Sequence, residues 1–76
     1  MSVEKRIMSV LRDRLGIPEG RITPDLIIMD EIDSPDRLEL IMQIEEEFNV
    51  TIPDRDAVEF RTVAQVVRYV EGREET

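Results

Sequence analysis

Apolar residues recur at helical spacing in three separate segments of the chain, and this repeated pattern constrains the fold more than any other feature. Residues spaced i, i+3, i+4 and i+7 lie on one side of an α-helix, so each segment predicts a helix with one apolar face. The segments span residues 3–15, 34–48 and 62–71. Since each face must be buried, we expect an all-α fold: a small antiparallel bundle of three long helices plus one short helix.

Turn-forming and capping residues mark where the first two helices end and begin. Gly16 and Pro18 follow the first segment and predict its end. Gly takes the left-handed conformation that ends a helix, and Pro blocks continuation of the helix. Ser34 is predicted to be the N-cap of the second helix, with Pro35 at the first helical position. The core face of this helix is predicted to comprise Leu40, Ile41, Ile44 and Phe48.

The last helix is predicted from a capping box and a terminal glycine. Thr62 and Gln65 form a Thr-x-x-Gln pattern, in which each side chain can bond the backbone of the other. We expect Gly72 to end this helix and residues 72–76 to form a frayed tail. With 76 residues, the chain is predicted to form one domain, 1–76.

The connections between the long helices carry weaker signals. In the connection 16–33, Thr23 followed by Pro24 reads as a helix cap with Pro at the first helical position. The apolar residues 26–29 predict either one helical turn or an extended piece, and in both cases they must cover the core. A short helix is expected at residues 54–60.

Composition excludes several classes of site. The sequence has no Cys and no His, which removes disulfides, Cys nucleophiles, His general bases and the usual zinc ligands. Its apolar runs are too short for a membrane span, and its N-terminal residues begin an amphipathic pattern rather than a secretory one, so we expect a cytoplasmic protein.

The net charge of −8 is concentrated in one part of the chain. Residues 30–59 contain eleven Asp and Glu residues, against only Arg37 and Arg55. A nucleic-acid partner is disfavoured because its phosphates would be repelled. Basic protein surfaces are the expected partners, since opposite charge speeds encounter.

Two acidic patterns are candidates for chemical sites. The consecutive acids 45–47 could suggest acid–base catalysis, but adjacent helical residues point in different directions and form a solvated surface. Asp30, Asp33 and Asp36 are spaced by three with no Gly among them, unlike a calcium-binding loop. We therefore expect neither an enzyme nor a dedicated metal site.

Ser34 admits two interpretations. Without a His it cannot belong to a catalytic triad, and its position suits a simple helix cap. Alternatively, Ser34 is a modification site, because its position between the long connection and the helix is one that a modifying enzyme can reach. A phosphodiester attached there would meet free backbone N–H groups at the helix N-terminus. Leu38 and Met42, one turn apart, lie on the flank between the apolar and acidic faces of this helix.

An extended run gives a specific resemblance. Residues 33–48 read Asp-Ser-Pro-Asp-Arg-Leu-Glu-Leu-Ile-Met-Gln-Ile-Glu-Glu-Glu-Phe. This run resembles the central segment of acyl carrier proteins, in which Asp-Ser-Leu-Asp precedes an apolar and Glu-rich stretch that ends in Phe. The similarity continues through Val-Thr-Ile-Pro-Asp at 50–54 and from Thr-Val at 62–63 to Tyr69. Together with the Leu-Gly at 15–16, it spans nearly the whole chain.

The resemblance implies an acyl carrier protein with no catalysis of its own. Ser34 would bear a covalent 4′-phosphopantetheine arm donated by coenzyme A, and Asp33 would belong to the same site. The terminal thiol of the arm would carry acyl groups as thioesters, which explains a carrier without its own Cys. Fatty-acid, polyketide and specialised acyl pathways are all compatible with this interpretation.

The resemblance also implies partners: a phosphopantetheinyl transferase, and acyl-transfer and synthase enzymes with basic docking patches, with the carrier itself a monomer. The residues implied in partner binding are Asp36, Arg37, Leu38, Glu39, Met42, Glu45 and Glu46. Three features depart from the family pattern: Pro35 replaces the usual Leu after the Ser, Arg37 adds a positive charge, and residues 30–32 stand, one residue short, where the family has a Leu-Gly element. The alternative is an unmodified acidic adaptor of the same fold, in which Ser34 is only a cap.

Overall fold

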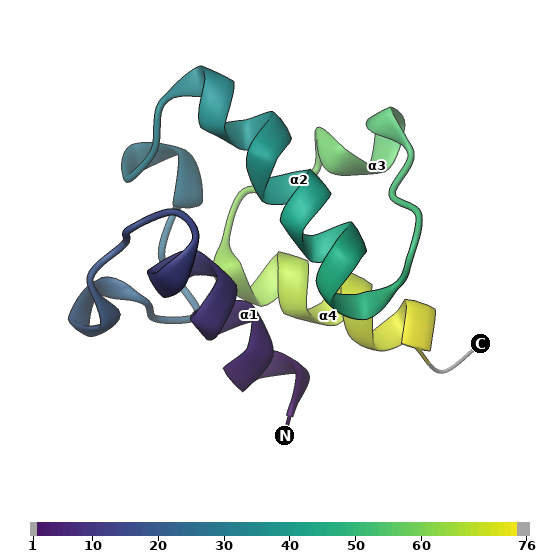
Figure 1. Ribbon diagram of the computed structural model, residues 1–76, viewed down its shortest axis with the longest axis horizontal. Helices are drawn as coiled ribbons and strands as arrows, with labels where there is room; N and C mark the ends of the chain where they lie inside the picture. Colours follow the sequence, from purple (N-terminus) through teal and green to yellow (C-terminus); the bar gives the residue numbers. More distant parts are fainter. Residues whose placement is uncertain (1, 75–76) are drawn as a thin grey trace.

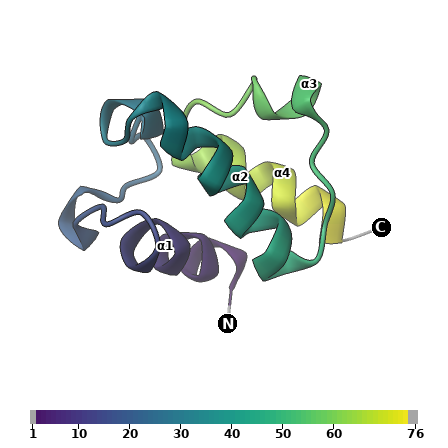
Figure 2. The same cartoon turned by 45° about the horizontal axis from the view of Figure 1, so that its top comes forward.

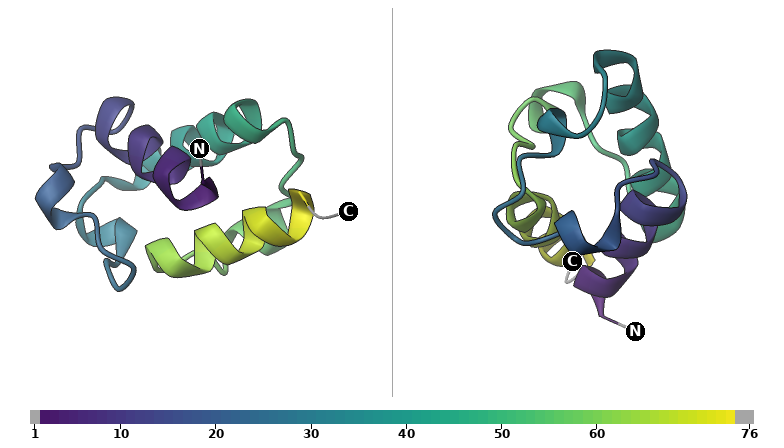
Figure 3. Two further views of the ribbon diagram at one scale, coloured as in Figure 1. Left: turned by 90° about the horizontal axis from the view of Figure 1, so that it is seen from below. Right: turned by 90° about the vertical axis from the view of Figure 1, so that its left-hand side faces the viewer.

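Three long helices and one short helix build the protein, as a computed structural model covering residues 2–74 shows (Figure 1). The long helices are α1 (Val3–Asp13), α2 (Ser34–Phe48) and α4 (Val63–Glu74), and α3 (Asp54–Ala57) is a single turn. Helix α1 runs in the opposite direction to α2 and α4 (Figures 1 and 3). The predicted all-α architecture is confirmed.

Helix α1 begins and ends with local signals. Ser2 is its N-cap, and the Ser2 side chain accepts a hydrogen bond from the Lys5 N–H at 3.2 Å. The helix was expected to reach residue 15 but ends at Asp13. Gly16 takes a left-handed φ of 72°, and the Ile17 N–H donates to the Leu11 carbonyl at 3.1 Å. This reversal directs Ile17 into the core, where it is buried.

The connection from α1 to α2 contains two 3₁₀ turns, η1 (Glu19–Arg21) and η2 (Ile28–Asp30). The helix start predicted at Thr23 is wrong, because the chain makes a tight turn there, with the Leu26 N–H bonded to the Thr23 carbonyl at 3.0 Å. Ile27 then forms an isolated antiparallel bridge with Thr62. Both alternatives for residues 26–29 are therefore realised in part: Ile27 is extended, and η2 is helical.

Helix α4 begins with the predicted capping box. The Thr62 N–H donates to Gln65 Oε1 at 2.8 Å, and the Gln65 N–H donates to Thr62 Oγ1 at 3.3 Å. The predicted end at Gly72 is wrong, because the helix continues through Gly72 to Glu74. Of the tail 72–76, the last two residues lie outside the described residues.

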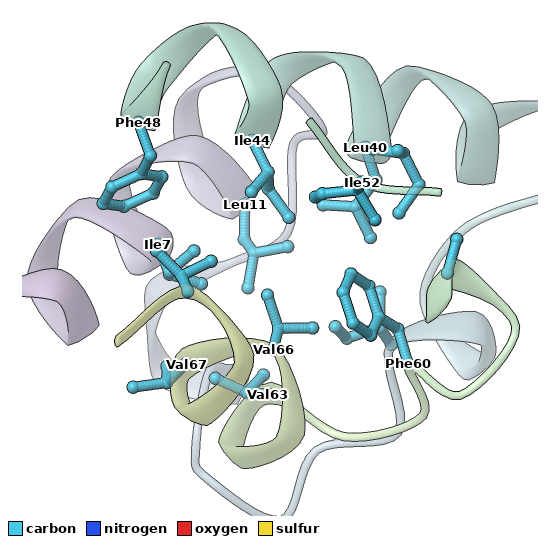
Figure 4. Packing of buried hydrophobic residues seen from close by; sticks show 14 of the residues in the cluster. Ile7, Leu11, Leu40, Ile44, Phe48, Ile52, Phe60, Val63, Val66 and Val67 are labelled. Atoms are coloured by element: carbon cyan, nitrogen blue, oxygen red, sulfur yellow. The ribbon is translucent and has the colours of Figure 1, made fainter. Parts of the chain in front are cut away.

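The core forms between α2 and the pair α1 and α4 (Figure 4). The predicted core face of α2 is confirmed, since all four of its residues are buried: Leu40, Ile41, Ile44 and Phe48. Among the side chains that pack with them are Ile7, Leu11, Ile52, Phe60 and Val66. This packing buries one side of α2 along its length and leaves its other side facing solvent.

Helix α3 lies on the connection between α2 and α4, at the edge of the bundle (Figure 2). The expected short helix at 54–60 is thus present but covers only the first four of those residues. Asn49 ends α2 in the left-handed conformation, with φ 54°, and the Val50 N–H bonds the Glu45 carbonyl at 3.2 Å. This cap turns the chain so that α3 returns beside the first half of α2.

Candidate functional site

The first turn of α2 is shifted by one residue from the predicted register. Asp33, not Ser34, is the N-cap: its backbone is extended (φ −82°, ψ 159°), and its carbonyl accepts the Asp36 N–H at 2.9 Å. Ser34 is the first helical residue, and Pro35 is the second. The local preference works against this register, because the residue before a Pro usually adopts an extended backbone, whereas Ser34 is helical and the extended position falls on Asp33.

The shift leaves the Ser34 hydroxyl free of capping. Ser34 is exposed, and within residues 2–74 the structure gives its Oγ no hydrogen-bond partner. A serine at the N-cap would instead accept a bond from a backbone N–H in the first turn. The hydroxyl is therefore accessible to another molecule and has no structural bond to lose.

A shallow groove of about 260 Å³ opens beside Ser34, between α2 and α3. Its lining comprises Ser34, Arg37, Leu38, Ile41, Asp54, Ala57 and Val58. Leu38 and Val58 are 66% and 67% exposed, so two large apolar side chains face solvent at one groove. Val58 was missed from the sequence, where the only signal was an apolar residue among charged neighbours at the end of the short helix.

Arg37 spans this groove. Its Nη2 donates to the Ala57 carbonyl oxygen at 3.0 Å, in a partly buried contact that joins α2 to the end of α3. The bond connects residues 20 positions apart, so no local sequence pattern predicts it. Arg37 is half-buried rather than fully solvated, unlike the neighbouring Leu38.

The remaining predicted partner residues divide into two groups. Glu39, Met42 and Glu46 are exposed together on the solvent side of α2, with Met42 at 49%, and Asp36 is half-exposed. Glu45 differs, because its Oε2 accepts the Ile52 N–H at 2.8 Å. That carboxylate anchors the connection leading to α3.

The acidic residues do not gather into a metal site. Within residues 2–74, no three Asp or Glu side chains lie close enough together to hold an ion. The same part of the chain has no helix that is both long and apolar enough to cross a membrane.

Comparisons with known proteins agree with this geometry. The sequence model of a family described as "Phosphopantetheine attachment site" matches residues 5–70. The chain is also 36% identical, over 72 residues, to an acyl carrier protein from Akkermansia muciniphila. The aligned region covers 92% of this chain and 90% of that protein. The chain therefore belongs to the acyl carrier protein family, whose prosthetic group is 4′-phosphopantetheine.

Proposed function

We propose that this protein carries acyl groups on a 4′-phosphopantetheine arm attached to Ser34 Oγ. The observation that carries the proposal is the exposed hydroxyl, which makes no hydrogen bond within residues 2–74 and opens α2 inside the region matched by the attachment family. The site fits the group, since Ser34 borders an open groove with apolar walls. When bound, the arm supplies a terminal thiol that holds acyl groups as thioesters.

During attachment, Ser34 Oγ is the nucleophile. Its oxygen forms a new bond to the phosphorus of coenzyme A, the phosphoanhydride bond breaks, and adenosine 3′,5′-bisphosphate leaves. We assign the base that takes the hydroxyl proton to the transferase. Asp33, exposed next to Ser34, completes the proposed site as a charged feature for the transferase to contact.

The docking surface that we propose combines exposed apolar and acidic side chains of α2. Leu38 and Met42 supply the apolar contacts, and Glu39 and Glu46 supply charge on the same solvent-facing side, with Asp36 at its edge. Partner enzymes are therefore expected to present basic residues around an apolar pocket. Glu45 contributes indirectly, through its bond to the Ile52 N–H.

Further features of the proposal follow from the sequence. The chain acts as one domain and a monomer, in the cytoplasm, without catalysis of its own, and it serves fatty-acid, polyketide or specialised acyl transfer. Its partners are the transferase and the enzymes that load, extend or unload the acyl group.

Intact-mass measurement tests the proposal against an unmodified adaptor. The chain is incubated with coenzyme A and a broad-specificity phosphopantetheinyl transferase, alongside Ser34→Ala and the control Ser9→Ala. We expect a gain of one arm in the parent chain and in Ser9→Ala, and none in Ser34→Ala. A chain that gains no mass with several transferases would be an adaptor instead.

A further inference from the structure

Arg37 is the only basic residue of α2. Between residues 30 and 54 it is also the only Lys or Arg in the sequence, and these residues include Asp33 and Asp36 on either side of Ser34. A phosphodiester at Ser34 would thus be placed among carboxylates, with one cationic side chain on the same helix. Among the side chains of α2, only that of Arg37 can attract the phosphodiester by opposite charge.

The position of Arg37 suits contact with a group on Ser34. The two residues are three apart, so their Cβ atoms lie about 5–6 Å apart on one helix face. Both line the groove between α2 and α3. A group attached to Ser34 Oγ is therefore within reach of the Arg37 guanidinium.

Arg37 also has donors to spare. A guanidinium carries five N–H donors in a planar fork. Within residues 2–74, the structure gives Arg37 one hydrogen bond, from Nη2 to the Ala57 carbonyl at 3.0 Å. The other donors can bind a second acceptor while the bond to Ala57 stays in place.

We propose that Arg37 binds the phosphodiester of an arm on Ser34 while it holds the Ala57 carbonyl, so that one side chain joins the arm to α3. The inference rests on the proposed function, because it requires the arm on Ser34. Bonds between guanidinium and phosphate oxygens are charge-assisted and geometrically matched. An anchored guanidinium loses less freedom when it binds, and a bound phosphate restrains it further against α3.

The consequence is that attachment of the arm steadies α3. This helix is one turn long, so tertiary bonds must hold it. Arg37 provides one such bond, and on another side Tyr69 Oη donates to Asp56 at 2.7 Å. The Arg37 bond is the one beside Ser34, since Tyr69 lines a separate groove.

Amide hydrogen exchange tests the inference on the modified and unmodified chains. The reporters are the Val58 N–H, bonded to the Asp54 carbonyl at 3.2 Å, and the Phe60 N–H, bonded to the Ala57 carbonyl at 3.1 Å. We expect both amides to exchange roughly three- to tenfold more slowly in the modified chain, the range for one added charge-assisted bond at a partly exposed site. Arg37→Gln should abolish this difference, and Arg55→Gln, which removes the same charge away from the Ser34 groove, should retain it.

Phosphorus NMR of the modified chains gives a second reading that does not depend on the stability of α3. Arg37→Gln should move the phosphodiester resonance and Arg55→Gln should not. Suppose that all three chains gain mass, that modification slows amide exchange equally in all three, and that their phosphorus spectra are identical. This result would overturn the role of Arg37 and leave the carrier function standing. Failure of every chain to gain mass would overturn both.

Discussion

Tyr69 Oη donates to the Asp56 carboxylate at 2.7 Å, and the Tyr69 ring packs edge-on against Phe60, with centroids 5.0 Å apart. Burial first, and then the bond to Asp56, raise the pKa of the Tyr69 hydroxyl above its ordinary value, against the opposing charge of Arg73. The neutral phenol is therefore favoured by folding. This single contact makes the attachment of α3 to α4 sensitive to pH.

Tyr69→Phe should change how the free energy of unfolding depends on pH in alkaline solution. Because the folded pKa of Tyr69 is raised, its stabilising effect is fully present below about pH 10, the unfolded value, and is lost as the pH rises through the folded value. At pH 7 we expect Tyr69→Phe to lower the free energy of unfolding by about 0.5–1.5 kcal/mol, for one lost hydrogen bond.

Urea unfolding between pH 7 and pH 11 measures this effect. The chain has one Tyr, no Cys, and Lys5 as its single Lys, so few other side chains titrate in this range. The variant should lose less stability than the parent above pH 10. Parallel curves for the two chains across the whole range would show that Tyr69 contributes nothing to this pH dependence.

At the scale of elements, two glycines at helix ends have opposite backbone requirements. Gly72 lies within α4, and a Cβ added there would meet nothing within 4 Å. Gly16 also has open space around it but adopts a φ of 72°, which side chains other than Gly rarely take. The same residue type thus weakens one helix and terminates another.

Gly72→Ala and Gly16→Ala are matched substitutions that should shift stability in opposite directions. Gly72→Ala should raise the free energy of unfolding by about 0.5 kcal/mol, less than the full preference of Ala over Gly because the position is near the helix end. Gly16→Ala should lower it by about 1 kcal/mol, the approximate cost of a left-handed Ala. Thermal and urea unfolding followed by circular dichroism measure both, and a destabilising Gly72→Ala would contradict the helical placement of that residue.

The length of α2 and its buried face could be predicted from residues 34–48, because helical periodicity is a local property. The capping box of Thr62 and Gln65 was equally readable. The role of Asp33 as N-cap could not be predicted from the sequence. Asp33 and Ser34 are both good capping residues, and the two possible helix starts differ by one residue. The turn at Thr23 has a local signal in Pro24 at its second position, but the bridge that follows, between Ile27 and Thr62, joins residues far apart in the sequence.

At the scale of the whole molecule, charge is distributed asymmetrically. Residues 30–59 hold nine net negative charges, and the rest of the chain is close to neutral. Part of this charge is balanced across elements: Arg6 of α1 pairs with Glu47 at 3.0 Å and lies over the Phe48 ring at 4.3 Å, and Arg21 pairs with Glu31 at 3.1 Å. These pairs are at least partly solvated and each contributes little, so repulsion along α2 is the larger effect.

Added salt should therefore raise the melting temperature. Screening of the repulsion in residues 30–59 outweighs the weakening of the surface ion pairs, and most of the rise should occur below about 0.15 M, where the Debye length falls to roughly 8 Å. Calorimetry over a series of NaCl concentrations measures the effect. Glu46→Gln, at an exposed position, should melt higher at low salt and respond less to salt; a melting temperature that falls with salt would contradict the argument.

The sequence by itself determined the three helices, the core face of α2, the acidic surface and the family, because periodicity, charge and an extended motif are properties of neighbouring residues. Only the tertiary structure decided that the Ser34 hydroxyl makes no hydrogen bond within residues 2–74, that Val58 lines one groove with Leu38, and that Arg37 crosses this groove to Ala57. The last two of these results depend on where α3 returns against α2. That return is set by the left-handed turn at Asn49 and by packing between segments distant in the chain.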